Sequence, residues 1–579
     1  MNAVSPVETL VTDHLDLWTA ALKRKSTAGR GSSTKVELYG IKKLRELILE
    51  LAVRGLLVPQ DPNDEPASEL LKRIAAEKAK LVKEGKIKKE KSLPLVSEEE
   101  KPFESPKGWL WERFGNLAEH NAGKTLDQGR NQGELRDYIT TSNLYWGKFD
   151  LSGVRQMPIE DTDLDKCQAI HNDLLICEGG EAGRAAVWNH DYPICFQNHI
   201  HRARFWQGIS PYYAYRLIEK MSYSGEINNY RKGVAISNMS GKALGSIPFP
   251  LPPLAEQHRI VAKVDELMAL CDQLEQETET SLGAHQTLVE TLLSALTSAA
   301  DHAQFASAWQ RIAGHFDTLF TTEESIAQLK QTILQLAVMG KLVPQDPNDE
   351  PASELLKKIA AEKAKLVKEG KIRNAKQLLP IAEDEKPFEL PSGWAFCRLQ
   401  ELVSTLGDGL HGTPIYDNAG DYYFINGNNL SNGDIVIKPD TKRVGQTEYE
   451  KHRKELNDST VLVSINGTIG NVAFFKGEQV ILGKSACYFN LLSGIEKLFI
   501  KRFIESPFFF GYAASQATGS TISNLGLKAM NAFPIPLPPT SEQVRIIAKL
   551  DELFALCDQL KSRLSDAQTT QLHLAACRT

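Results

Sequence analysis

The sequence predicts a mixed α/β protein in which two related globular domains are separated by long helices that form an antiparallel coiled coil. A chain of 579 residues is too long for a single hydrophobic core. Much of it occurs twice, at an offset of 285 or 286 residues, and this repeat gives the fold a pseudo-twofold plan. Each copy ends in an apolar pattern typical of coiled coils.

The longest repeated block is helical in character. The stretch LVPQDPNDEPASELLKRIAAEKAKLVKEGKI (57–87) recurs at 342–372 with one change, Arg73 to Lys358. It is rich in helix formers, and its Lys and Glu content is typical of a solvated helix face. The near identity indicates one docking surface presented twice. Recent recombination would also make the two blocks alike.

The repeat divides the chain into helical and globular parts. The predicted segments are an N-terminal helical region (1–105, repeated as 286–390), a first globular domain (106–250), a central helical region with a coiled-coil helix (251–390), a second globular domain (391–536) and a C-terminal coiled-coil helix (537–579). The globular parts have diverged. LLICEGGEAGRAAVW (174–188) and VLVSINGTIGNVAFF (461–475) still share a strand, Gly-x-x-Gly turn, strand pattern.

Each globular domain is followed by an apolar seam with alternating spacings of four and three residues, the pattern of a coiled coil. A Pro pair before each seam marks a domain edge. Two short seams most simply pack on each other, with their cysteines as small buried apolar residues. The seam residues are Ile260, Val264, Leu267, Cys271, Leu274, Ile546, Leu550, Leu553, Cys557 and Leu560.

One stretch of the sequence partly matches a nucleotide-binding motif. AEHNAGKT (118–125) fits a permissive phosphate-loop pattern, which requires a strand before it and a helix after it. The turn-like TLDQGRNQG that follows argues against a nucleotide site. Dinucleotide, metalloprotease, hydrolase, zinc and adenine-methyltransferase motifs are absent from the sequence. The chain lacks the equipment of a self-sufficient enzyme, and no metal site is expected.

Composition places the chain among cytoplasmic globular proteins. The eight cysteines form no CxxC pair, which favours a reducing compartment. No apolar run reaches membrane-spanning length, and the first residues lack signal-peptide features.

Binding is the remaining chemistry. Lys and Arg balance Asp and Glu at 16 to 16 in 107–250 and 13 to 13 in 392–536, so any phosphate affinity must come from local clusters. Arg, Asn and Ser side chains also read base edges. The candidate DNA-binding residues are Lys124, Arg130, Arg184, His199, His201, Arg202, Arg204, Arg231, Lys232, Ser237, Asn238, His411, Lys442, Arg443, Lys484, Ser523, Asn524 and Lys528. Ordinary surface charge remains an alternative for each.

Two variable domains, each followed by a PxPLPP…EQxRIxAKxDEL…CDQL signature at half-length spacing, resemble the specificity subunits of Type I restriction–modification systems. The resemblance covers nearly the whole chain. It implies that each variable domain is a target recognition domain for one half of a split, asymmetric site in double-stranded DNA. It also implies an antiparallel coiled coil that fixes the distance between the domains.

The same resemblance implies the partners. Two methyltransferase subunits would dock on the helices and use S-adenosylmethionine, and two restriction subunits would use ATP and Mg²⁺. The chain itself would bind no cofactor, catalyse nothing and still be required for both methylation and restriction in phage defence. One alternative is a pseudo-symmetric coiled-coil adaptor that binds proteins rather than DNA. Another is a single-chain methylating endonuclease, which the missing motifs argue against.

Overall fold

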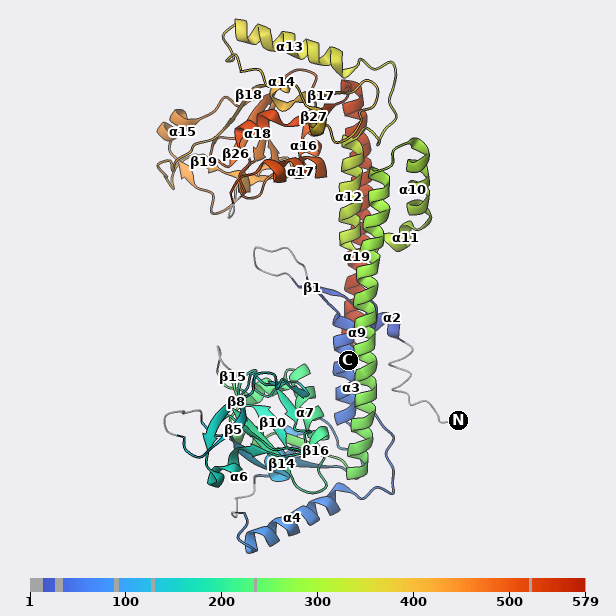
Figure 1. Cartoon of the computed structure of the whole chain (residues 1–579), viewed down its shortest axis with the longest axis vertical. Helices are drawn as coiled ribbons and strands as arrows, with labels where there is room; N and C mark the ends of the chain where they lie inside the picture. Colours follow the sequence, from blue (N-terminus) through green and yellow to red (C-terminus); the bar gives the residue numbers. More distant parts are fainter. Residues whose placement is uncertain are drawn as a thin grey trace. The chain divides into compact units, whose positions relative to one another are not determined.

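The structure is a computed structural model that describes residues 14–25, 35–87, 93–125, 131–233, 237–519 and 523–577 (Figure 1). The chain divides into two compact units. Unit 1 comprises residues 1–282 and 567–579, and unit 2 comprises residues 283–566. Within the described ranges no helix combines the length and the apolar character needed to cross a membrane.

Unit 1 begins with helices and continues into a globular domain built mainly of strands. In chain order its elements are α2 (Leu15–Ala20), β1 (Lys23–Lys25), β2 (Lys35–Glu37), α3 (Tyr39–Val53), α4 (Ala67–Lys83), η1 (Glu98–Glu100), β3 (Leu110–Arg113), α5 (Phe114–Leu117), β4 (Ala118–Ala122), β5 (Glu134–Ile139), β6 (Leu144–Tyr145), β7 (Lys148–Phe149), β8 (Arg155–Ile159), η2 (Asp161–Asp163), α6 (Leu164–Cys167), β9 (Gln168–Ala169), β10 (Leu174–Cys177), β11 (Gly179–Gly180), β12 (Ala185–Val187), β13 (Ile194–Phe196), β14 (Ile200–Phe205), α7 (Pro211–Tyr223), η3 (Glu226–Tyr230), β15 (Ser237–Asn238), α8 (Gly241–Gly245), β16 (Pro248–Leu251) and the start of α9 (Leu254–Thr297).

Unit 2 follows the same plan. Its elements are α10 (His302–Gly314), α11 (Phe316–Leu319), α12 (Glu323–Val338), α13 (Ala352–Lys368), η4 (Glu383–Glu385), β17 (Ala395–Arg398), α14 (Leu399–Leu402), β18 (Val403–Asp408), β19 (Tyr422–Ile425), η5 (Gly427–Asn429), β20 (Leu430–Ser431), β21 (Asp434–Ile435), β22 (Arg443–Val444), α15 (Gln446–His452), β23 (Thr460–Ser464), β24 (Val472–Phe474), β25 (Val480–Leu482), β26 (Ala486–Leu491), α16 (Lys497–Ile504), α17 (Pro507–Gln516), α18 (Leu527–Ala532), β27 (Pro534–Leu537) and the start of α19 (Thr540–Cys577).

The two globular domains share one sheet topology although their sequences are hard to align. In unit 1 the main sheet has the order β12-β10-β14-β4, and in unit 2 the matching sheet has the order β24-β23-β26-β18. A second sheet contains β8-β5-β13 in unit 1 and β22-β19-β25 in unit 2, each with one parallel pair. The Gly-x-x-Gly turns join antiparallel strands, as predicted. The expected fold class, two mixed α/β domains with long helices, is confirmed.

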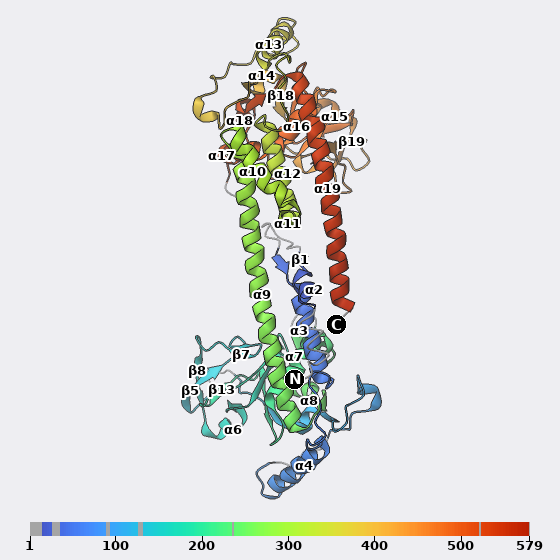
Figure 2. The ribbon, with the colours of Figure 1, turned by 90° about the vertical axis from the view of Figure 1, so that its right-hand side faces the viewer.

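In unit 1 the apolar seam of α9 packs on α3, and the two helices lie side by side in both views (Figures 1 and 2). One buried cluster contains Ile260, Val264, Leu267 and Cys271 of α9 together with Leu44 and Ile48 of α3. Leu274 is partly buried against it. At the rim, Arg45 of α3 forms ion pairs with Asp272 (2.7 Å) and Glu275 (2.8 Å) of α9.

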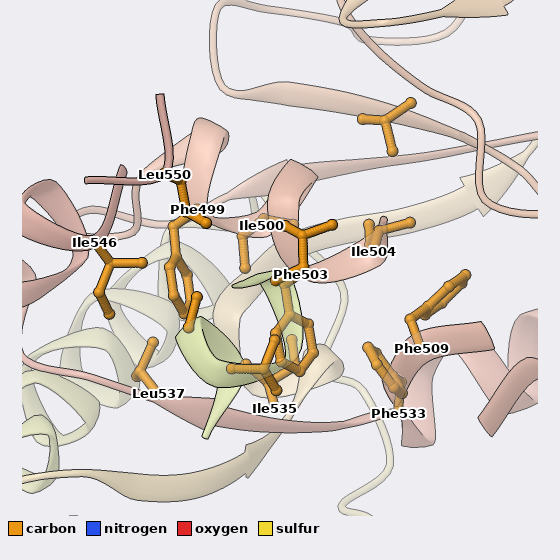
Figure 3. Packing of buried hydrophobic residues seen from close by; sticks show 14 of the residues in the cluster. Phe499, Ile500, Phe503, Ile504, Phe509, Phe533, Ile535, Leu537, Ile546 and Leu550 are labelled. Carbon is orange, nitrogen blue, oxygen red and sulfur yellow. The ribbon is translucent and has the colours of Figure 1, made fainter. Parts of the chain in front are cut away.

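Unit 2 repeats this arrangement with α12 and α19. Ile546, Leu550 and Cys557 share a buried cluster with residues of α12, and Leu553 and Leu560 are partly buried against it. Ile546 and Leu550 lie close to Phe499 of α16 in the same core (Figure 3). Spacing alone predicts a contact between the two seams. That prediction does not include α3 and α12, whose apolar stripes pack on the seams of α9 and α19 within each unit.

The EQ signature at the start of each long helix joins that helix to its domain. In unit 1 the indole N–H of Trp109 donates to the buried carboxylate of Glu256 (2.9 Å). The side chain of Gln257 accepts from the backbone N–H of Ser210 (2.7 Å) and donates to the carbonyl of Pro252 (3.0 Å). Arg259 pairs with Asp64 of the connector (2.6 Å). We call these residues the joint of unit 1.

Unit 2 has the same joint at equivalent positions. The indole of Trp394 donates to Glu542 (3.0 Å), Gln543 accepts from the backbone N–H of Glu496 (2.9 Å), and Arg545 pairs with Asp349 (2.6 Å). Burial raises the pKa of both Glu256 and Glu542. The sequence signature is therefore explained by contacts that fix each domain to its long helix.

The near-identical helices α4 and α13 are attached mainly by their first turns (Figure 1). Of the 17 residues of α4, only Ala67, Leu70 and Ile74 are buried, and α13 buries the three equivalent residues. The backbone N–H of Ala67 donates to the carbonyl of Gly108 (2.9 Å). Most of each helix is therefore available to a partner.

Candidate nucleic-acid interface

Four loops meet at one edge of the main sheet in unit 2. They comprise residues 409–411, 465–470, 483–485 and 523–525, and we call them reading edge 2. The backbone N–H of Ile465 donates to the carbonyl of Ser485 (3.0 Å), that of Leu525 to Ile465 (2.8 Å), and that of Leu410 to Leu482 (2.7 Å). These bonds hold the loops together without help from exposed side chains.

The same backbone framework occurs in unit 1, where residues 123–125, 178–183, 197–199 and 237–239 form reading edge 1. The backbone N–H of Glu178 donates to His199 (2.8 Å), that of Met239 to Glu178 (2.8 Å), and that of Lys124 to Phe196 (3.1 Å). Each bond matches one in unit 2. The two edges thus place different side chains on equivalent backbone positions.

A close backbone contact explains the glycine in the phosphate-loop pattern. A Cβ on Gly123 would lie 2.1 Å from the carbonyl oxygen of Phe196, and a Cβ on Gly409 would lie 2.0 Å from that of Leu482. Residues 118–122 form strand β4, whose backbone pairs with β14. The backbone N–H groups of Gly123 and Lys124 donate to the carbonyls of Ile200 (3.1 Å) and Phe196 (3.1 Å), so these amides are not free to bind phosphate as those of a phosphate loop are.

Reading edge 2 contains a hollow of about 390 Å³. Its lining is Asp408, His411, Ile465, Asn466, Lys484, Asn524, Gly526 and Leu527. The ring of His411 hydrogen-bonds Asp408 at Nε2 (2.6 Å), and the amide of Asn466 donates to that of Asn524 (3.3 Å). Asp408 and Asn466 line the hollow but are not among the residues predicted from the sequence. The position of Asn466 beside the Gly-x-x-Gly turn was the available signal.

Several of the predicted DNA-binding side chains have partners within their own domain. Lys124 pairs with Asp163, Arg204 with Asp173 (2.7 Å), and Arg443 donates to the hydroxyl of Tyr423 (3.1 Å). The other engaged candidates are Arg184, bonded to the carbonyl of Thr141 (2.6 Å), His201, bonded to that of Met239 (3.0 Å), Arg231, bonded to that of Ala182 (2.7 Å), and Ser237, bonded to that of Gly180 (2.6 Å).

Arg202 is the most deeply placed of these candidates. Its side chain is 0% exposed, and its Nη1 donates to the carbonyls of Asp165 (2.9 Å) and Gln168 (2.7 Å). Its Nη2 donates to Glu119 (3.3 Å). Burial lowers the pKa of this guanidinium. A side chain held in this way reaches no base edge unless it leaves its carbonyl partners.

Other candidates are accessible. Lys232, Lys442, Lys484 and Lys528 are exposed, and none forms an ion pair with another residue that the structure describes. His199, Asn238, His411 and Ser523 are exposed too, and Asn524 is half-buried. Arg130 lies outside the described residues. Of the nine accessible candidates, Lys232 and Lys442 lie outside the two edges, and Lys528 lies on α18.

Within the described ranges, no three His, Cys, Asp or Glu side chains are grouped so that they could hold a metal ion. Cys271 and Cys557 are buried free thiols. Burial raises the pKa of both, which matches the apolar packing role that their seam positions predict.

The fold and the two edges define a protein with two related recognition domains, each attached to a long helix. A family model described as the Type I restriction modification DNA specificity domain matches residues 106–283 and 391–567. The chain is 42% identical over 610 residues to the Type I restriction enzyme EcoAI specificity subunit of Escherichia coli, covering 99% of both proteins. It is 40% identical over 605 residues to the EcoEI specificity subunit of Escherichia coli, again covering 99% of both.

The chain belongs to the family of Type I restriction enzyme specificity subunits. It is accordingly a DNA sequence-recognition subunit and not a catalytic one, and the protein-binding adaptor is not supported. Among solved structures, the crystal structure of the HsdS subunit from Thermoanaerobacter tengcongensis is 16% identical, with a TM-score of 0.40, and the match covers 83% of this chain and 97% of that one. At this score the likeness adds nothing to the assignment.

Proposed function

We propose that each globular domain reads one half of a bipartite, asymmetric site in double-stranded DNA. The observation that carries this proposal is the pair of reading edges, which have matched backbone hydrogen bonds and different side chains. One scaffold with two sets of side chains suits two different half-sites. Exchanging residues 107–235 for the equivalent segment of a relative should change one half of the methylated motif. A change in both halves, or in neither, would contradict the assignment.

We also propose that α4 and α13 dock two copies of one methyltransferase subunit. A solvated helix face has no physical reason to keep its sequence, yet only Arg73 and Lys358 differ between these two largely exposed helices. A shared partner supplies a reason, and recent recombination is the competing one. In the full complex, two restriction subunits complete the assembly. The partners supply the sites for S-adenosylmethionine, ATP and Mg²⁺, and the complex acts in the cytoplasm on DNA.

Native mass spectrometry of the co-expressed complex tests the docking. Three exposed residues of α4 are changed to Glu (Lys72→Glu, Ala76→Glu and Lys83→Glu), and the matched changes in α13 are Lys357→Glu, Ala361→Glu and Lys368→Glu. Each set should remove one methyltransferase copy, and both sets together should remove two. Changes at such exposed sites cost little stability, within about 0.5 kcal/mol each. Two copies bound to every variant would disprove docking at these helices, and recombination would then explain the repeat.

Catalysis should depend on those partners. The purified chain, incubated with DNA and labelled S-adenosylmethionine, should transfer no methyl groups. The same assay with the co-expressed methyltransferase subunit is the positive control. Transfer by the chain alone would contradict the proposal.

A further inference from the structure

We infer that Lys484 reads a guanine in the half-site of the second domain, and that the structurally equivalent Asn198 gives the first domain a different base preference at the same place. This inference rests on the proposed function, because it assigns base chemistry to one position of each reading edge.

The loop that carries Lys484 is held rigidly while its side chain stays exposed. A Cβ on Gly483 would lie 2.2 Å from Oδ1 of Asn426, so the loop backbone packs directly on that residue. The hydroxyl of Ser485 donates to Asn426 Oδ1 (3.0 Å) and accepts from the backbone N–H of Gly427 (2.9 Å). Such preorganisation lowers the cost of binding, because little order remains to be gained.

Lys484 forms no ion pair in the hollow, within the part of the chain that the structure describes. Asp408 also lines the hollow, but its carboxylate is engaged by the ring of His411 at 2.6 Å. No ion pair joins Lys484 to any acidic group that the structure describes. The ammonium group therefore keeps its donors for a ligand.

The chemistry of a lysine favours guanine, the one base with two acceptors on its major-groove edge. The major-groove edge of guanine offers two acceptors, O6 and N7, whereas adenine places the N6 donor beside N7. An ammonium group only donates, so it matches guanine and faces a donor on adenine. Lys484 lies in a hollow beside the amides of Asn466 and Asn524. Lys528 lies on α18 and does not line that hollow, so we assign the base contact to Lys484.

Asn198 occupies the matching position in unit 1. The backbone N–H of Ile200 donates to Gln197 (2.9 Å), and that of Ala486 donates to Gly483 (3.0 Å). Asn198 and Lys484 are thus the second residues of equivalent turns between equivalent strands. An asparagine amide both donates and accepts, which is the pattern that pairs with adenine. The two domains therefore carry side chains of different hydrogen-bonding chemistry at structurally equivalent positions.

The test is a Lys484→Asn variant co-expressed with its partner subunits in a host that lacks other adenine methylation. Methylome sequencing should show that one guanine position in one half of the motif accepts adenine or becomes degenerate, while the other half is unchanged. With purified complexes, the preference for the original site over a site with that G·C pair replaced by A·T should fall about tenfold or more. The reciprocal Asn198→Lys variant should alter only the other half.

Lys438→Asn is the matched control, because Lys438 is exposed, lies outside reading edge 2 and forms no ion pair with another residue that the structure describes; it should leave the motif intact. An unchanged motif and discrimination ratio in Lys484→Asn would overturn the inference. So would uniform weakening on all DNA sequences with a salt slope reduced by about one, which marks a phosphate contact. If the unmodified complex yields no methylation motif at all, the proposed function fails. A clear wild-type motif that Lys484→Asn leaves unchanged refutes the base assignment alone.

Discussion

Replacing Arg202 with methionine tests whether this arginine supports the domain from inside or reads DNA. Its Nη1 makes two hydrogen bonds to carbonyl oxygens, at 2.7 and 2.9 Å. Hydrogen bonds that involve a charged group contribute about 1.5–3 kcal/mol each. Methionine fills a similar volume and removes the cost of burying a cation, which offsets part of the loss. The expected net loss of local stability is about 2–4 kcal/mol.

Peptide-resolved hydrogen exchange on the full chain measures this loss at β14. At about 1.4 kcal/mol per factor of ten, protection of the β14 amides should fall roughly 30- to 1,000-fold. Lys232→Met is the control, since Lys232 is exposed and without an ion pair among the described residues, and its effect should stay within about 0.5 kcal/mol. Unchanged protection in Arg202→Met, together with an altered half-site, would refute the structural role.

Three further results are expected. Burial raises the pKa of Glu542, so the folded chain binds more protons than the unfolded chain between the ordinary and the raised pKa, and stability falls as the pH rises through that window. The melting temperature should decline over this pH range, and the decline should be smaller in Glu542→Gln. Leu550 of the seam is 1% exposed, and Leu550→Ala should lower the free energy of unfolding in denaturant by about 2–5 kcal/mol. Leu556 is 54% exposed, and Leu556→Ala should lower it by under about 0.5 kcal/mol; equal losses would contradict the burial of the seam. Four residues inserted after Thr280 lengthen α9 by about 6 Å and turn it by about 40°, so methylome sequencing should show both half-sites with a changed spacer, or no methylation. An unchanged spacer with full activity would show that α9 does not set the distance between the half-sites.

The helices could be predicted from sequence because their signals are local. The four–three spacing of Ile260, Val264, Leu267 and Cys271 marks a buried stripe, and the structure buries all four. The partner of that stripe could not be predicted in the same way. Arg45 meets Asp272 across 227 residues of chain, and nothing in the local pattern of α9 points to α3.

The interface is harder to predict, because a charged sequence indicates exposure even where the fold buries it. HIHRAR has the composition of a surface cluster, yet residues 200–205 form β14, which pairs on both sides within its sheet. Burial on both faces of a central strand depends on what covers the sheet, and a single strand's sequence does not show that. Lys484, in a loop after a short apolar strand, was easier to predict as accessible.

The last turns of α19 contribute to the core of the unit that is synthesised first. Ala575 is 0% exposed and belongs to the same buried cluster as Cys271 of α9 and Leu44 of α3. Translation at about 5–20 residues per second takes roughly 15–60 s to pass from the seam of α9 to the last turns of α19. Through that interval the nascent chain holds a nearly complete unit 1 with one apolar site uncovered. Synthesis of the last turns of α19, and not synthesis of the first domain, is therefore the step that completes this core.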